Sequence, residues 1–336
     1  MTVRPRRRLP SVALCLVVLL AGVFPAGCTA TKAVAASRIT LGYSAWPGWF
    51  PWAIAQQQGL FTRNGLDVEL KYYDNYTDSL NALATGVIDA NSQTLNDTLT
   101  SIAGGAKQSI VLVNDNSTGN DKIIARDGIT SIADLSGKRV GVEQGTVDHY
   151  LLLLALAQAG LDQSNVRIEA MPTDQAAAAF AGGQLDAVAL FAPFTTKALQ
   201  RPGSRAIATS AEFPGAIPDH LVVKPSLIQA HPEEVQALVN TWFETVSWIK
   251  NHREAAYQIM AKQGGVSVTE YKTYDAGTTI FTRQQNLDAF TPGTDASHLN
   301  FQAGQIADFM VSTGLVQNRP SLDGLFDDRF VQAVPG

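Results

Sequence analysis

Large aromatic side chains are concentrated in one short segment of this sequence. Residues 43–52 hold five large rings and two prolines. The rings are Tyr43, Trp46, Trp49, Phe50 and Trp52. So many rings in one loop cannot all be core, and Trp and Tyr offer a rigid face to a ligand at little entropic cost. We therefore predict that Tyr43, Trp46 and Trp49 contact a ligand, and that at least one of the five rings packs only on its own helix.

Four more segments, 92–97, 114–116, 143–146 and 191–194, follow predicted strands. Open α/β sheets bind ligands beyond the carboxyl ends of their strands, so these segments are expected to meet at one cleft. The residues predicted to contact the ligand there are Asn96, Asp97, Asp115, Glu143, Gly145, Thr146, Phe191 and Phe194. Asp97 and Thr146 have an alternative role as caps of the helices that follow them.

The charge of these segments bears on the ligand. They contain no Lys or Arg but carry Asp97, Asp115 and Glu143, with Asp148 close by. A carboxylate or sulfonate usually recruits the bidentate guanidinium of Arg, whereas aromatic faces beside carboxylates suit an amine, an amidine or a nitrogen-rich ring. Free N–H groups at helix starts also attract anions. We therefore favour a nitrogenous or cationic ligand, and a sulfonate or nitrate-like anion stays open as the alternative.

Signatures of catalysis are missing from the sequence. There is no G-x-S-x-G elbow, no P-loop and no G-x-G-x-x-G after a strand. The five histidines show no metal-ligand spacing. We predict a protein that is not an enzyme and that uses neither a metal nor another cofactor.

The beginning of the sequence has the pattern of an export signal. Arginines 4, 6, 7 and 8 precede an apolar run at 9–24, and Ala-Gly-Cys follows at 26–28. The ending resembles a bacterial lipobox, in which the cysteine becomes the lipidated first residue. We predict a lipoprotein signal peptide at 1–27, lipid attachment at Cys28 and a flexible tether at 28–37. The alternative is ordinary cleavage after Ala-Val-Ala at 33–35.

The overall charge argues against nucleic acid as a partner. The formal net charge is −5, and loss of residues 1–27, with four arginines and no acid, makes it −9. The other cysteine, Cys15, also lies in the predicted signal, so the mature chain would form no intrachain disulfide.

Short β-type runs alternate with helical stretches, which predicts an α/β architecture. Strands are expected at 39–43, 68–72, 109–113, 139–142, 187–190 and 221–223, and helices at 79–85 and 150–159. Gly86 and Gly160 follow these helices, where a left-handed residue is expected. The same pattern occurs at 80–90 and again at 177–187. A helix is followed by a glycine and then by a strand that starts with an apolar residue, Asp and Ala. This repeat indicates two lobes of similar construction.

Several segments together resemble the substrate-binding proteins of ABC importers of the nitrate/sulfonate/taurine type. They are Leu-Gly-Tyr-Ser-Ala-Trp at 41–46, Gln-Gly-Leu-Phe at 58–61, Asn-Gly-Leu-Asp-Val-Glu-Leu at 64–70, Ala-Leu-Ala-Thr-Gly-Val-Ile-Asp at 82–89, Ser-Ile-Ala-Asp-Leu-Ser-Gly-Lys-Arg-Val-Gly-Val at 131–142 and Gly-Thr-Val-Asp-His-Tyr at 145–150. The resemblance covers nearly all of the mature chain, and the order and spacing of the segments carry it.

The resemblance implies a type II periplasmic-binding-protein fold, with two α/β lobes around a ligand cleft. Lobe 1 would hold 38–121 and 220–336, and lobe 2 would hold 122–219, with crossing strands near 122–125 and 220–223. It also implies a monomer outside the cytoplasmic membrane that delivers a small solute to a permease and its ATPase. Alternative functions are a ligand-sensing lipoprotein of the same fold that reports to a membrane receptor, and a pyrimidine-precursor-binding protein.

Overall fold

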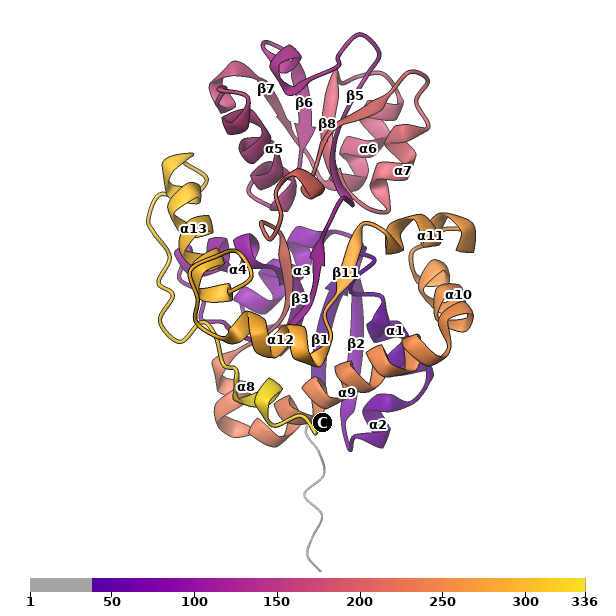
Figure 1. Ribbon diagram of the computed structural model, residues 1–336, viewed down its shortest axis with the longest axis vertical. Coiled ribbons are helices and arrows are strands. Elements are labelled where there is room, and N and C mark those ends of the chain that lie inside the picture. Colours follow the sequence, from indigo (N-terminus) through magenta and orange to yellow (C-terminus); the bar gives the residue numbers. More distant parts are fainter. Residues whose placement is uncertain (1–37, 336) are drawn as a thin grey trace, which may run out of the picture. The chain divides into compact units, whose positions relative to one another are not determined.

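The strands of the protein pair into two mixed sheets, seen in the computed structural model of residues 38–335 (Figure 1). The first sheet has the order β11 (Thr278–Ile280), β4 (Ser109–Ser117), β10 (Pro218–Val223), β3 (Ala90–Thr94), β1 (Arg38–Ser44) and β2 (Asp67–Tyr73). The second has the order β7 (Arg167–Ala170), β6 (Arg139–Val142), β8 (Ala187–Phe191), β5 (Asp121–Ala125) and β9 (Arg205–Thr209). Cys28, the predicted export signal and the tether lie outside the described residues.

Helices follow most strands. They are α1 (Pro51–Gln57), α2 (Leu60–Arg63), α3 (Tyr76–Ala84), α4 (Leu95–Ala103), α5 (Val147–Gln158), α6 (Thr173–Ala181), α7 (Phe194–Leu199), α8 (Pro225–Ala230), α9 (Pro232–Asn251), α10 (Arg253–Gln263), α11 (Val268–Asp275), α12 (Arg283–Phe290), α13 (Leu299–Ser312) and α14 (Arg329–Gln332). The predicted strands all lie within observed strands, and Gly86 and Gly160 have positive φ angles of 77° and 72°. The predicted α/β class is confirmed.

The strands of the second sheet alternate between two buried faces, as expected for a sheet covered on both sides. Ile124, Val188 and Leu190 pack against Ala177 of α6 and Ala198 of α7 in one cluster. The intervening side chains of β5 and β8 belong to the main core, together with the leucines of α5. The helices therefore press on the sheet from both faces and fix where its strands end.

The sequence repeat at 80–90 and 177–187 corresponds to a structural repeat. The backbone N–H of Asp89 donates to Thr40 O (3.0 Å), and the Asp89 carboxylate accepts from Thr40 N (2.8 Å). Asp186 makes the same two bonds with Arg139, each 3.0 Å long. Both aspartates thus fasten the start of a central strand, β1 or β6, to the turn before its neighbour, β3 or β8. The two sheets therefore share a local plan, which makes their strand ends comparable.

The positions of the crossings differ from the prediction. Residues 122–125 and 220–223 lie inside β5 and β10, each within one sheet. The chain passes between the sheets earlier, at 118–120 after β4 and at 210–217 after β9. The predicted lobe limits therefore separate Asp121, Pro218 and Asp219 from the sheet to which each belongs. The division into two moving lobes stays a prediction.

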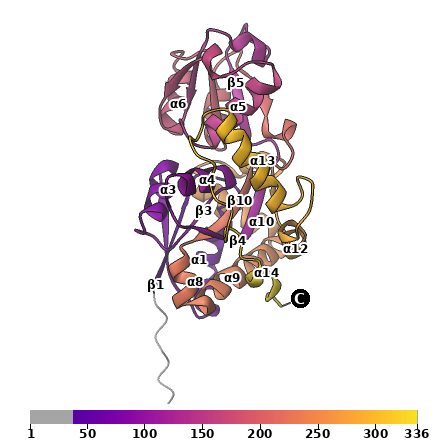
Figure 2. The same cartoon turned by 90° about the vertical axis from the view of Figure 1, so that its left-hand side faces the viewer.

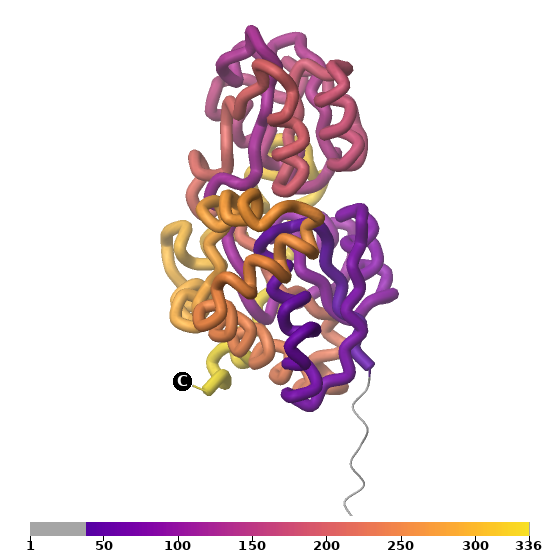
Figure 3. The backbone as a smooth tube through the Cα atoms, turned by 90° about the vertical axis from the view of Figure 1, so that its right-hand side faces the viewer, coloured from indigo at the N-terminus to yellow at the C-terminus, as the bar shows by residue number. Residues whose placement is uncertain are grey.

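Segments distant in sequence surround the first sheet. Helix α1 packs against α9 and α10, so that indigo and orange segments lie side by side in Figure 3. Helix α13 packs against α4 (Figure 2). The C-terminal third thus helps to hold α1 and α4, the two helices that follow the aromatic loop and β3.

Candidate ligand-binding site

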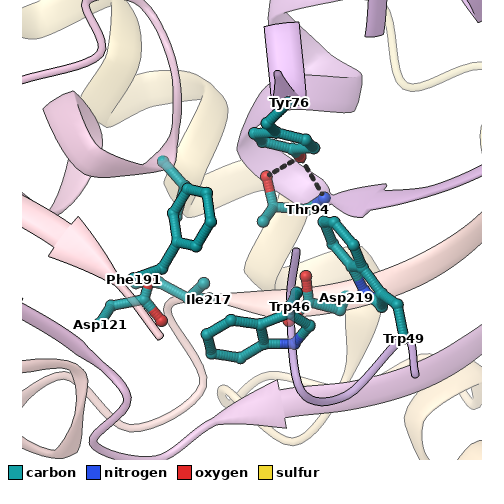
Figure 4. Close-up of a pocket in the computed structure, with 9 residues that line it drawn as sticks. Trp46, Trp49, Tyr76, Thr94, Asp121, Phe191, Ile217 and Asp219 are labelled. Atoms are coloured by element: carbon teal, nitrogen blue, oxygen red, sulfur yellow. Dashed lines mark hydrogen bonds between the residues drawn. The ribbon is translucent and has the colours of Figure 1, made fainter. Parts of the chain in front are cut away.

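A small cavity lies where segments attached to the two sheets meet (Figure 4). Its empty volume, counted together with space open to solvent, is about 220 Å³, and the centre of a water-sized sphere can reach only about 10 Å³ of it. It is lined by Trp46, Trp49, Tyr76, Thr94, Asp121, Val147, Phe191, Ile217 and Asp219. The tryptophans follow β1, Thr94 ends β3 and Phe191 ends β8. The cavity therefore lies beyond the carboxyl ends of parallel strands, which is the usual position of ligand sites in α/β sheets.

Four aromatic rings form a closed circuit around this space. The centroid of Trp46 lies 6.4 Å from that of Trp49 and 6.4 Å from that of Phe191. The Tyr76 centroid lies 5.4 Å from that of Trp49 and 6.0 Å from that of Phe191. Figure 4 shows the four rings arranged around a common space. We call this arrangement the aromatic box.

Several buried contacts hold the rings of the box. Trp46 Nε1 donates to Asp115 Oδ1 at 2.8 Å. Tyr76 OH accepts from the backbone N–H of Thr94 at 3.0 Å. A Cβ atom at Gly48 would lie only 2.1 Å from Asp115 Oδ2, so any larger residue there would displace this carboxylate. The close contact between Gly48 and Asp115, together with the bond from Trp46 to the same carboxylate, thus holds Trp46 at the cavity.

All five rings of the predicted aromatic loop are buried in the main core, so the expectation that they cannot all be core is wrong, and they differ instead in whether they line the cavity. Trp46 and Trp49 line the cavity. Trp52 is fully buried, lies 4.7 Å from Trp242 between ring centroids, and donates from Nε1 to Ser92 Oγ at 2.9 Å. Tyr43 is buried at the end of β1 against Tyr72 and is not among the residues lining the cavity. The ligand contact predicted for Tyr43 has no support in this geometry, because its ring packs on Tyr72 of β2.

Two acids occupy equivalent positions at the cavity. Asp121 begins β5 and pairs with Phe191, the last residue of β8, whereas Asp219 in β10 pairs with Thr94, the last residue of β3. Only 2% of Asp121 and 1% of Asp219 is exposed. Burial raises the pKa of Asp121 to about 7, against hydrogen bonding from Ser117 and the charge of Lys122. Asp121 and Asp219 therefore face the cavity from the two sheets.

Asp219 also forms an acid pair with Asp115. The two residues are directly opposite each other on β10 and β4. Burial raises the pKa of Asp115 to about 7, while hydrogen bonds from Trp46 and Asp219 lower it. Burial raises the pKa of Asp219 well above its usual range, and the negative charges of Asp115 and Asp121 add to this effect. Two such neighbours cannot both ionise easily, so the pair shares a proton near neutral pH.

Glu143 lines a second small cavity and connects two helix starts. One of its oxygens accepts from the backbone N–H of Thr77 in α3 at 3.3 Å and from the Thr77 hydroxyl. Its other oxygen accepts from the N–H and hydroxyl of Thr173 in α6, at 3.3 and 2.5 Å. The Thr173 hydroxyl also lies 2.7 Å from Asp148 Oδ2. Because α3 belongs to the first-sheet side and β6 to the second, the Glu143–Thr77 contact joins the two sides.

The other predicted residues lie around the cavity. Asp97, Gly145 and Thr146 line a larger groove next to it, and Phe194 lines a second small cavity and contacts Phe191 at 5.5 Å between centroids. Asn96 is buried and donates to Asp97 Oδ1 at 2.8 Å. The capping role considered for Asp97 is wrong, because Thr94 caps α4 and accepts from Asp97 N–H. Thr146 precedes α5, but its hydroxyl donates to Glu143 O and makes no cap bond.

Sequence reasoning missed several lining residues, above all Tyr76, Asp121 and Asp219. The two acids stand directly before the segments predicted as crossing strands, in Asp-Lys-Ile-Ile-Ala at 121–125 and Asp-His-Leu-Val-Val at 219–223. The same order of an acid, a basic side chain and three apolar residues in both segments was the available signal. Tyr76 had no comparable signal, since it is one ring among the first residues of a helix.

Metal-binding and membrane-spanning features are not found in the part of the chain that is described. Within 38–335, no group of three or more His, Cys, Asp or Glu residues is arranged to hold a metal ion. The helices of this same range are all too short or too polar to cross a membrane.

Relatives of this chain are binding proteins. A putative binding protein of Brucella abortus (strain 2308) is 30% identical over 214 residues, which cover 62% of this chain. The match spans 66% of that relative's length. The taurine-binding periplasmic protein of Escherichia coli (strain K12) is 26% identical over 256 residues, 72% of this chain and 78% of the relative.

Solved structures share the fold. The alkanesulfonate-binding protein SsuA of Xanthomonas axonopodis pv. citri, bound to MOPS, superposes with a TM-score of 0.75 at 20% identity, covering 88% of this chain and 100% of that protein. The desulfurization enzyme DszB superposes with a TM-score of 0.61 at 19% identity, covering 88% of this chain and 98% of that protein, so the fold also serves an enzyme. The predicted periplasmic-binding-protein fold is therefore confirmed, and so is the resemblance to sulfonate- and taurine-binding proteins. Residues 32–263 match the model of the NMT1-like family, and the chain belongs to that family.

Proposed function

We propose that this protein is the extracytoplasmic substrate-binding component of an ABC importer of the nitrate/sulfonate/taurine type. It captures a small polar solute and delivers it to a permease. The observation that carries the proposal is the cavity, which is lined by rings and acids from both sheets. Binding-protein relatives, one of them periplasmic by name, support it. We expect a monomer that works with permease and ATPase subunits.

The chemistry of the cavity favours binding over turnover. Its nine lining residues include two acids, Asp121 and Asp219, but no Cys, Ser, His, Lys or Arg that could act with them as nucleophile or electrophilic clamp. The Thr94 hydroxyl is engaged with Asp97 Oδ2 at 2.7 Å. We therefore propose reversible binding of an unchanged solute, even though an enzyme shares the fold.

A ligand screen with a cavity variant tests the proposal. Candidate solutes are guanidine, quaternary amines, pyrimidines, taurine, alkyl sulfonates and nitrate. A true ligand at about 100 times its Kd should stabilise the protein by roughly 2.7 kcal/mol, which a thermal-shift assay detects. Trp46→Ala should then weaken binding at least about tenfold in calorimetry, because it removes one wall of the aromatic box.

The matched control is Trp248→Ala, since Trp248 stacks on His252 and lies outside the cavity lining. It should leave the affinity unchanged. If Trp46→Ala remains folded by circular dichroism and binds a confirmed ligand as tightly as the unmodified protein, the site is wrongly placed.

Anchoring by lipid at Cys28 is part of the proposal. Cys28→Ser should move the protein from the membrane fraction to the soluble fraction, or leave the precursor uncleaved, because serine cannot form the thioether to lipid. Metabolic labelling with a fatty acid measures this directly. A mature-sized, lipid-labelled variant that still sediments with membranes would show that another residue carries the anchor.

A further inference from the structure

Unpartnered carboxylate oxygens face the cavity. Asp121 Oδ2 has no hydrogen-bond partner, and Asp219 has none apart from Asp115, the acid with which it shares a proton. Both residues line the cavity and are almost completely buried. A buried polar atom without a partner is costly, and native proteins rarely keep one without a reason. N–H donors of a ligand would satisfy these oxygens.

The aromatic box adds a second, independent feature. Neighbouring ring centroids lie 5.4 to 6.4 Å apart around the circuit. If the four centroids lie near the corners of a square, a charge at its centre is roughly 4 Å from each ring, within the ~6 Å range of cation–π attraction. The aromatic rings and the carboxylates therefore both attract positive charge.

No cation of the described chain occupies this position. The cavity lining contains no Lys or Arg. Lys122, next to Asp121 in sequence, donates from Nζ to Gly119 O. Successive side chains of a strand point to opposite faces, so Lys122 points away from the side on which Asp121 meets the cavity. The positive charge that the site favours must therefore come from the ligand.

Three helix starts near the cavity, those of α3, α5 and α6, already hold carboxylates of the chain. Glu143 accepts from the first turns of α3 and α6. The backbone N–H of Val147, at the start of α5, is one of the hydrogen bonds that lower the pKa of Asp97 against the larger effect of burial. Helix starts are the usual way to bind an anion without arginine. In this protein the N–H donors of α3, α5 and α6 are already hydrogen-bonded to Glu143 or Asp97. An anion in the cavity would also meet the acids Asp121 and Asp219.

We infer that the cavity binds a small organic cation with N–H groups, of the amidinium, guanidinium or protonated-amine class. The aromatic box surrounds the cation, and Asp121 and Asp219 accept its N–H groups. The centre of a water-sized sphere can reach only about 10 Å³ of this cavity, close to the space of a single water, so a ligand larger than a few heavy atoms would require the rings to move apart. This inference rests on the proposed function and specifies its substrate.

Three molecules of nearly equal shape test the sign of the charge. Acetamidinium, acetamide and acetate differ in charge but little in size, and methanesulfonate and taurine extend the anionic arm. With the full mature chain in calorimetry at about pH 8, acetamidinium should bind at least about tenfold more tightly than acetamide, and acetate should not bind. Methylguanidinium and trimethylammonium probe the limits of size within the cationic class.

Charge-neutralising variants locate the effect. Asp121→Asn and Asp219→Asn should each weaken acetamidinium binding at least about tenfold. Both changes preserve shape and remove a buried acid, so folding is expected to be retained and is checked by circular dichroism. Asp308→Asn, at a mostly exposed acid paired with Arg319, is the matched control and should bind normally.

The outcomes separate this inference from the proposed function. If acetate, methanesulfonate or taurine binds and Trp46→Ala abolishes that binding, the cationic class is wrong while the binding function stands. Failure of all cations to bind at about 10 mM also overturns the inference. If no solute of any charge in the wider screen binds, the proposed function fails with it.

Discussion

The melting temperature of the ligand-free protein is expected to fall as the pH rises from about 5 to about 8. Burial is the main cause that raises the pKa of five acids at or beside the cavity. They are Asp97, Asp115 and Asp121, each to about 7, and Asp148 and Asp219, both well above the usual range. The folded protein therefore holds protons that the unfolded chain has released. Stability from these groups is complete below about pH 4 and is lost as the pH rises through about 7.

Two buried histidines act in the opposite direction. Burial lowers the pKa of His220 to about 3 and also lowers that of His149. Stability from these neutral histidines is lost as the pH falls below about 6.5. Five acids outweigh two histidines, and above about pH 6.5 the acids act alone. Each proton held on folding lowers the free energy of unfolding by about 1.4 kcal/mol per pH unit.

A thermal melt at pH steps, with denaturant titrations for free energy, measures this slope. Asp121→Asn should reduce the slope by about one proton, whereas Asp308→Asn should leave it unchanged. The groups that interact with Asp121 are Ser117, Lys122, Asp115, Asp148 and Asp219. A melting temperature that stays level or rises from about pH 6.5 to 8 would contradict the buried, protonated state of these acids.

Binding of a cationic ligand should offset part of the loss of stability at high pH. It favours the ionised acids, so affinity for acetamidinium should rise by about tenfold or more between pH 5.5 and 8.5, with release of protons. An anionic ligand would show the opposite slope. The pH dependence therefore gives a second reading of ligand charge that does not depend on any substitution.

Glu143→Ala is expected to weaken ligand binding by on the order of 10- to 100-fold. The carboxylate joins Thr77 on the first-sheet side to Thr173 on the second-sheet side, so it holds the two sides together. Hydrogen bonds to a charged group are worth about 1.5–3 kcal/mol each, and each 1.4 kcal/mol is tenfold in an equilibrium constant. The ligand-free variant should also show a larger radius of gyration in X-ray scattering.

Threonine variants provide the matched control. Thr77→Val removes only the hydroxyl contact that joins the two sides and should reproduce part of the loss. Thr173→Val removes a contact between β6 and α6 on one side and should have the smaller effect on opening. If Glu143→Ala leaves both the radius of gyration and the affinity unchanged, the Glu143–Thr77 contact does not hold the two sides together.

Local patterns in the chain were sufficient for the elements and their class. The strand at 139–142 and the glycines after the two predicted helices depend on apolar alternation and on backbone conformations that only a few residues adopt easily. The paired motif at Asp89 and Asp186 was also visible. The motif could be recognised from the sequence because each aspartate bonds only to the neighbouring strand start and so fastens two adjacent strands.

The composition of the cavity depended on tertiary structure. Tyr76 contacts Phe191 only because α3 begins where β8, more than a hundred residues later in the chain, ends. Tyr43 and Trp52 belong to the same aromatic segment as Trp46, yet packing against Tyr72 and Trp242 makes them core residues. Tyr43, Trp46 and Trp52 are all large rings within one ten-residue segment, and nothing in the sequence distinguishes their roles. The sequence alone therefore determined only that a ring-rich segment lies at the end of the first strand. Which rings reach the cavity was decided by the helices and strands that cover the others, and the acidity of the cavity was decided by two strand starts brought together from different sheets.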